Sequence, residues 1–304
     1  MVESSAAGHA KSLESTGQTY VDEAAEYRNG FAERLREHWG RSLELFELLV
    51  ASCEEGGALF ARRNLRQGGS RDALLDVLVQ LNGQAVRTAR EVHALLSARF
   101  PFGAHALSRT VHELSVRAAV LAQFSQDDRH ADLAERFVLR ADVINYRDAI
   151  VYQRNARVLG YEEFSDESIA ELKSRHDELI ERFGPAFGSP YEWAINLPGL
   201  PNPRKPTFAD LEARADLDHF RGIYYWPSHF VHADSKALNL SRVERGGSSA
   251  VLTNATNIML ADPGQYTLLG LYRVFVSIVT SAQNLRVLRP PFVPVVTDHD
   301  GQGL

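Results

Sequence analysis

The stretch 107-LSRTVHELSVRAAVLAQF-124 carries the strongest evidence on the fold of this chain. At about 100° per residue of an α-helix, its apolar residues fall on one face and continue around the adjacent side. The main face holds Leu107, Val111, Leu114, Ala118 and Leu121, and the adjacent side holds Val116, Val120 and Phe124. A helix that is apolar on nearly every side is surrounded by other elements. We therefore predict a helix over about 103–125 at the centre of a helical bundle.

Proline positions divide the chain into two parts. Only Pro101 precedes residue 185, whereas six prolines lie between residues 185 and 206. Proline is excluded from helix interiors and pushes the preceding residue out of the helical region. The first 184 residues can therefore be helical almost throughout, and residues 185–206 are expected to form a long irregular loop.

Apolar spacing and capping residues predict the remaining elements. Helices are expected over 18–55, 70–99, 128–159 and 166–183, and after the loop a short helix from Thr207, a segment over 216–234 interrupted at Pro227, and a last helix from Asp262. Residues 236–261 are expected to be mostly loop, with a small hairpin as an alternative. The predicted fold is all-α: an antiparallel multi-helix bundle with a long proline-rich loop and a short irregular or hairpin insert. We expect a flexible N-terminus over 1–17, one domain over 18–288, and an extended or disordered tail over 289–304.

Composition restricts the class of protein. Hydrophobic residues make up 44% of the chain, enough for a sizeable core. The formal net charge of -6 argues against a general nucleic-acid binder. The single cysteine, Cys53, excludes a disulfide scaffold, and the N-terminus lacks the apolar segment of a secretory signal. We expect a soluble, cytoplasmic protein that does not bind a membrane.

Several common catalytic motifs are missing from the sequence. It contains no G-x-S-x-G, no G-x-x-x-x-G-K-[ST], and no G-x-G-x-x-G after a strand. His112 and Glu113 begin like a zinc-protease helix, but Val116 occupies the position of the second histidine. Arginine followed four to six residues later by histidine, the mark of a helical ribonuclease class found in toxins and phage defence, occurs no more often than chance predicts. We therefore predict no cofactor and no metal.

The first candidate cluster lies on the predicted central helix. Arg109 and Glu113 are four residues apart and can touch, with His112 and Arg117 nearby. The helix is largely apolar, so the pair is expected to be at least partly buried. It is either a structural ion pair that braces neighbouring helices or part of a functional site.

A second cluster follows the proline-rich loop. If this segment is helical, four residues fall within a narrow arc, at Arg221, Tyr225, Ser228 and His232. Ser228 and His232 lie one turn apart, so the serine is either an activated nucleophile or only a hydroxyl that satisfies the imidazole. His229, His232 and Asp234 are alternatively metal ligands.

A third feature is an arginine stripe along the predicted helix 128–159. Its members share one line at helical pitch: Arg129, Arg136, Arg140, Arg147 and Arg154. Guanidinium groups bind phosphates bidentately, so Arg136, Arg140 and Arg147 are candidate ligand-binding residues. The alternative is that they turn inward and pair with acids of the first helix, such as Glu33, Glu37, Glu44 and Glu47.

The order of these features resembles that of an uncharacterised family of helical bacterial proteins. The resemblance covers about residues 75–288 and rests on the run Leu107 to Tyr146 and on Tyr224, Ser228 and His232 with the Gly246–Gly247 loop. It implies that Arg109, Glu113, Ser228 and His232 belong together, and it implies no activity.

From the residues, we predict a composite polar pocket. Arg109 would anchor an anion, Glu113 would be the orienting group, and His232 would titrate with Ser228 as its partner. Arg221 and Tyr225 would contribute to ligand binding. The function expected is that of an intracellular effector or enzyme, toxin-like or defensive, acting on a phosphate-bearing small molecule or RNA. The alternative is a non-enzymatic scaffold that binds a protein partner or a second copy of itself, and whose polar cluster is structural.

Overall fold

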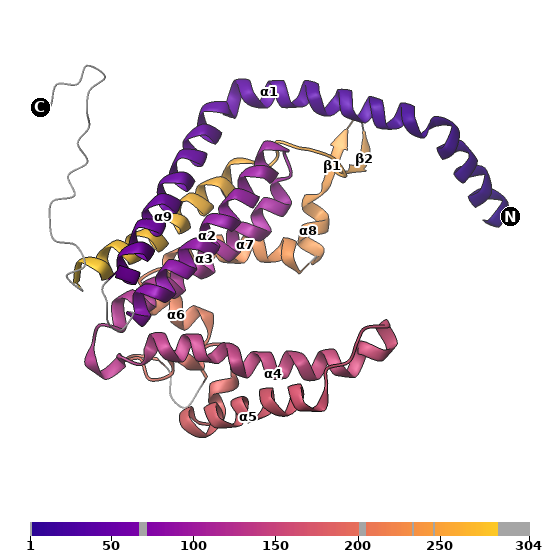
Figure 1. The fold of residues 1–304 in the computed structure, drawn as a ribbon. Coiled ribbons are helices and arrows are strands. Elements are labelled where there is room, and N and C mark those ends of the chain that lie inside the picture. Colours follow the sequence, from indigo (N-terminus) through magenta and orange to yellow (C-terminus); the bar gives the residue numbers. More distant parts are fainter. Residues whose placement is uncertain (1, 67–71, 201–204, 233, 246, 285–304) are drawn as a thin grey trace, which may run out of the picture. The chain divides into compact units, whose positions relative to one another are not determined.

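The computed structural model describes residues 2–66, 72–200, 205–232, 234–245 and 247–284. Within these ranges the regular structure consists of nine α-helices, four short 3-10 helices and one two-stranded hairpin (Figure 1). The all-α prediction is confirmed. The tail predicted over 289–304 lies outside the described residues. No helix in the described part of the chain combines the length and apolarity needed to span a bilayer.

The first five helices follow the predicted order. They are α1 (Val2–Arg66), α2 (Ala73–Ser97), α3 (Pro101–Phe124), α4 (Leu133–Leu159) and α5 (Asp166–Phe183). The first helix was expected only over 18–55, and residues 2–17 were expected to be flexible, yet α1 includes them. The segment contains no proline, and a glycine such as Gly17 costs an exposed helix only about 1 kcal/mol.

The proline-rich segment contains two short 3-10 helices, η2 (Pro185–Gly188) and η3 (Glu192–Ala194). Helix α6 (Phe208–Arg214) then begins at a capping box in which Thr207 and Asp210 bond to each other's backbone N–H groups. The predicted short helix is therefore present, and its start was readable from the spacing of these two residues.

The segment predicted over 216–234 contains η4 (Asp218–Phe220) and α7 (Arg221–Val231). Helix α7 continues through Pro227, which is buried, so the proline removes one donor without ending the helix. Beyond it lie α8 (Ser235–Leu240) and the antiparallel hairpin of β1 (Arg242–Arg245) and β2 (Ser248–Val251). The last helix, α9, spans Ala261–Asn284.

The chain divides into two compact units. A single domain over 18–288 stays a prediction. Unit 1 comprises Met1–Glu55, Leu81–Arg117 and Thr207–Val274, and unit 2 comprises Gly56–Gln80, Ala118–Pro206 and Phe275–Leu304. Four boundaries between them fall inside helices α1, α2, α3 and α9. A division inside helices, without a linker between the units, differs from the usual boundary between domains.

In unit 1 the core forms where α3 meets α9. Val111 and Leu114 on α3 and Leu271 and Val274 on α9 are all buried. A Cβ atom added at Gly270 would lie 2.9 Å from Cγ1 of Val111. The two backbones thus approach closely at this glycine, which keeps α3 central, as its sequence predicts, and places its polar residues beside α6 and α7.

In unit 2, α4 and α5 form a helical pair (Figure 1). Gly160 ends α4 in the left-handed conformation, with φ at 69°. Arg182 of α5 donates to Glu135 of α4 at 2.9 and 3.1 Å, and Arg175 donates to Asp142 at 3.1 Å. These exposed ion pairs each contribute little free energy, so the pair depends mainly on its apolar contact.

Candidate functional site

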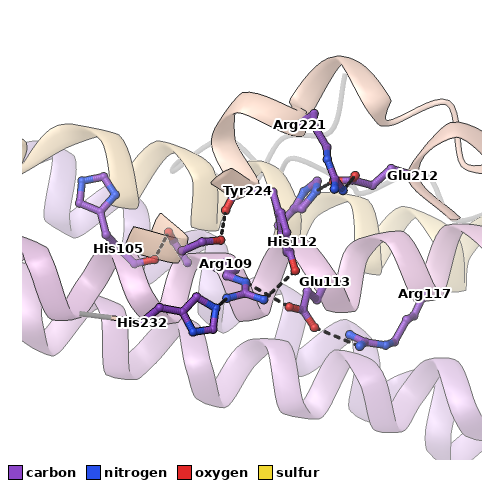
Figure 2. A network of polar contacts seen from close by, with 11 residues as sticks. His105, Arg109, His112, Glu113, Arg117, Glu212, Arg221, Tyr224 and His232 are labelled. Atoms are coloured by element: carbon purple, nitrogen blue, oxygen red, sulfur yellow. Dashed lines mark hydrogen bonds and ion pairs between the residues drawn. The ribbon is translucent and has the colours of Figure 1, made fainter. Parts of the chain in front are cut away.

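Arg109 of α3 is the centre of a polar cluster in unit 1 (Figure 2). Its Nε lies 3.3 Å from Oε1 of Glu113, and its Nη2 donates to the hydroxyl of Tyr224 at 2.6 Å. Its Nη1 lies 3.4 Å from Nε2 of His232. Because a guanidinium has only donors, Nε2 of His232 accepts in this contact. An imidazole that accepts at Nε2 carries its proton on Nδ1.

Glu113 holds the cluster on the α3 side. Its Oε2 accepts a hydrogen bond from Nη2 of Arg117 at 3.0 Å, while its Oε1 faces Arg109. The three side chains are 18–23% exposed. The expectation of a partly buried Arg109–Glu113 pair on α3 agrees with this geometry, and the carboxylate sets the position of the Arg109 guanidinium.

Aromatic rings of α7 continue the cluster. The Cζ atoms of Arg109 and Arg221 lie 4.5 and 5.2 Å from the ring centroid of Tyr224. The Cζ of Arg221 also lies 4.9 Å from the ring centroid of Tyr225. Cations near aromatic rings are attracted by the ring quadrupole. His232, Arg109, Tyr224, Arg221 and Tyr225 thus form one chain of contacts, which we call the cation–aromatic series.

A second, buried network supports the series from α6. Glu212 has no exposed side-chain surface, and it accepts a hydrogen bond from Nε2 of His112 at 2.8 Å. Its other oxygen pairs with Arg221 (Figure 2). His112 was expected in the first candidate cluster, near Arg109 and Glu113, but its partner Glu212 was not predicted. The one local signal was the position of His112, three residues after Arg109 and on the polar side of α3.

Ser228 does not have the predicted place in the site. Its Oγ donates to the carbonyl oxygen of Tyr224 at 2.7 Å, one turn earlier in α7. A serine inside a helix commonly satisfies its hydroxyl in this way. Arg109, Glu113 and His232 therefore meet across α3 and α7, whereas the proton of Ser228 is directed to the backbone rather than to the imidazole.

The possible metal ligands near the end of α7 have other partners. Nδ1 of His229 bonds to Oδ2 of Asp234, and this bond lowers the pKa of the aspartate. The other oxygen of Asp234 accepts from Lys236 N and Ala237 N and caps α8. Within the described ranges, no group of three or more histidine, cysteine or acidic side chains could hold a metal ion.

These residues all lie in a region with recognisable relatives. A model of a family of unknown function (DUF5677) matches residues 75–248, more than half of the chain. The chain belongs to this family. The resemblance to an uncharacterised helical family is therefore confirmed, and the matched region includes every residue of the cation–aromatic series. No curated protein and no solved structure matches the chain.

The DUF5677 region also contains the arginine stripe of α4, in unit 2. Arg136 is 6% exposed and donates to the carbonyl oxygens of Trp193 and Glu192, both at 3.2 Å. Arg140 donates to the carbonyl of Ser189 at 2.9 Å, and Arg147 to that of Gly188. These three arginines thus pair with backbone carbonyls of the η2–η3 segment rather than with carboxylates of the first helix. Arg129 precedes α4 and pairs with Asp127, and Arg129 and Arg154 are exposed.

The proline-rich sequence explains why arginines of α4 donate to backbone carbonyls. A segment that forms only short 3-10 turns leaves carbonyl groups without helical partners, and buried carbonyls need donors. The three guanidiniums of α4 supply these donors. Burial also lowers the pKa of Arg136, although Asp132 and Glu192 oppose this effect. The η2–η3 segment is therefore bound by Arg136, Arg140 and Arg147. These contacts do not support the predicted phosphate-binding stripe.

Proposed function

We propose that the Arg109 cluster binds the phosphate group of a phosphate ester and that His232 transfers a proton when the ester is cleaved. The observation that carries this proposal is the 3.4 Å contact between Nη1 of Arg109 and Nε2 of His232. This contact joins the Arg109 guanidinium on α3, which Glu113 and Tyr224 hold in place, to an exposed imidazole at the end of α7.

Arg109 is suited to be the anion anchor. Glu113 and Tyr224 engage its Nε and Nη2, which orients the guanidinium and directs Nη1 toward His232. Phosphate oxygens are stronger acceptors than a neutral imidazole nitrogen, because charged partners strengthen hydrogen bonds. A phosphate oxygen would therefore replace Nε2 of His232 as the acceptor for Nη1 of Arg109.

His232 is suited to be the base. Its Nε2 carries the lone pair that faces Nη1 of Arg109, and the side chain is exposed to solvent. Once phosphate occupies Arg109, Nε2 can accept the proton of a water or hydroxyl as its oxygen bonds to phosphorus. The imidazolium then gives this proton to the departing ester oxygen as the old P–O bond breaks. No net proton is gained or lost by the protein.

A second candidate function has its own support. Glu113 contacts Arg109 and Arg117, and Glu212 contacts His112 and Arg221, so both carboxylates are already satisfied within the fold. Such a cluster is also what a structural brace requires. In that case the protein would be a helical scaffold for a protein partner.

The two functions differ in the response of Arg109 variants. We expect Arg109→Ala and Arg109→Lys to weaken binding of ribose 5-phosphate at least about tenfold, because each loses charge-assisted donors. Isothermal titration calorimetry measures this. Arg90→Ala is the matched control, since Arg90 is 49% exposed and pairs only with Glu54 among the ion pairs described. His232→Ala should keep ribose 5-phosphate binding and lose cleavage of bis(4-nitrophenyl) phosphate.

The opposite results would reject the site. Equal affinity for ribose 5-phosphate in the wild type and both Arg109 variants contradicts an anion anchor. If Arg109→Lys, which keeps the charge, lowers the melting temperature by several degrees while no phosphate ester binds the wild type, the brace is the correct function. Retained cleavage in His232→Ala removes the histidine from the mechanism.

A further inference from the structure

We propose that the ligand of this site is a nucleotide, with its base stacked on Tyr225 and its phosphate at Arg109 and His232. This inference rests on the proposed function and names the substrate class. It comes from the cation–aromatic series, which extends from the phosphate-binding end at His232 to an aromatic ring at the other end.

Tyr225 has the properties of a stacking platform. It is 56% exposed, a high value for a large aromatic residue, and the Cζ of Arg221 lies 4.9 Å from its ring centroid. Proteins bind unpaired bases by stacking them on tyrosine rings and on arginine guanidinium planes. An exposed ring with an arginine beside it can stack on the face of any base, so this contact does not select one base over another.

The platform is built on a buried support. Arg221 pairs with Glu212, whose side chain is fully buried, and Glu212 also accepts from His112. Holding a buried carboxylate costs free energy unless it is paired. Here that carboxylate positions a partly exposed arginine near the rings of both Tyr224 and Tyr225.

The two ends of the series also have a suitable spacing. Tyr225 and His232 are seven residues apart at α7 and its C-terminal cap, so they fall on nearly the same face. Seven residues correspond to about 10 Å along the helix. The base and phosphate of one nucleotide are separated by a distance of the same order, so a single nucleotide can reach both ends.

The test compares ligands that differ only by the base. Calorimetric titration with 5′-AMP and with ribose 5-phosphate isolates the contribution of adenine. We expect AMP to bind the wild type at least about tenfold more tightly than ribose 5-phosphate, the size of one stacked base. Tyr225→Ala should remove this difference and leave ribose 5-phosphate binding unchanged, whereas Tyr225→Phe should keep it. Tyr272→Ala is the matched control, because Tyr272 is also 56% exposed.

Each outcome decides between the proposals. Equal affinity for AMP and ribose 5-phosphate, with both lost in Arg109→Lys, overturns the base platform and leaves the phosphate site standing. An AMP preference that survives in Tyr225→Ala also overturns the platform. Binding of neither ligand to the wild type overturns both proposals. Tighter binding of an adenine dinucleotide than of AMP supports the platform and assigns the nucleotide to an RNA strand.

Discussion

His105 shows how burial of one titratable residue affects the stability of unit 1. Its ring is fully buried on α3 and stacks on Phe230 of α7, with ring centroids 5.4 Å apart. Burial lowers its pKa from 6.5 to about 4, against a smaller opposing effect of Asp262. The native state thus keeps this histidine neutral at a pH where the unfolded chain would protonate it.

The sign of the resulting pH dependence follows directly. Between pH 6.5 and about 4 the unfolded state binds more protons at this position, so the free energy of unfolding falls as the pH is lowered. The full shift corresponds to a loss on the order of 3 kcal/mol. We expect His105→Phe to lose less stability than the wild type over this range in chemical denaturation. Parallel stability curves for the two proteins from pH 7 to 4 would contradict a neutral, buried His105.

The composite site was partly predictable at this scale. Arg109 and Glu113 could be predicted because a spacing of four residues on a helix implies contact. His232 could be predicted because it lies one turn after Ser228, within a narrow helical arc. The contact of Glu212 with His112 could not be predicted, because the two residues lie 100 positions apart and Glu212 is on a helix of seven residues. No periodicity in the sequence encodes which long-range carboxylate meets a given histidine.

At the scale of elements, the crossing of α3 and α9 depends on a residue without a side chain. A Cβ at Gly270 would lie 2.9 Å from Cγ1 and 3.2 Å from the carbonyl oxygen of Val111. The β-branched valine is stiff and the second atom belongs to the backbone, so relief requires the helices to move apart. The periodicity of α3 predicted that this helix is central, but it did not predict this glycine.

Substitution of this glycine tests the crossing. Overpacking in Gly270→Ala is expected to cost about 1–3 kcal/mol, more than offsetting the roughly 1 kcal/mol that alanine gains in a helix. Gly83→Ala is the control, because nothing lies within 4 Å of a Cβ at Gly83 in α2. In thermal denaturation Gly270→Ala should melt below the wild type and Gly83→Ala above it. Equal gains in both variants would mean that α3 and α9 do not approach closely.

Helix α7 shows where sequence rules give way to tertiary structure. Proline in a helix interior predicts a break, and the segment 216–234 was accordingly expected to be interrupted at Pro227. The observed helix passes through this residue because its burial in unit 1 offsets one missing hydrogen bond. As a result Tyr225 and His232 keep their common face, which the proposed nucleotide site requires.

At the scale of the whole molecule, charge and arginine use restrict how a nucleic acid could bind. The chain has a formal net charge of -6, which opposes polyanions at long range. Three arginines of the α4 stripe are engaged by carbonyl groups of the η2–η3 segment. The helical spacing of the arginines suggested a phosphate-binding surface, but it could not show that a proline-rich segment uses the same guanidiniums as donors.

Binding of single-stranded RNA should therefore depend on the Arg109 site and not on the stripe. Each phosphate neutralised on a single strand contributes about 0.7 to the slope of log affinity against log salt. One site predicts a slope near this value, whereas Arg136, Arg140 and Arg147 acting together would give roughly 2. Filter binding over a salt series measures the slope.

We expect the Arg140→Ala/Arg147→Ala double variant to retain RNA like the wild type while its melting temperature falls, because carbonyls of the η2–η3 segment lose their donors. Arg109→Lys should bind RNA more weakly than the wild type and keep its melting temperature. A slope of 2 or more that drops in the double variant would return the stripe to the binding surface.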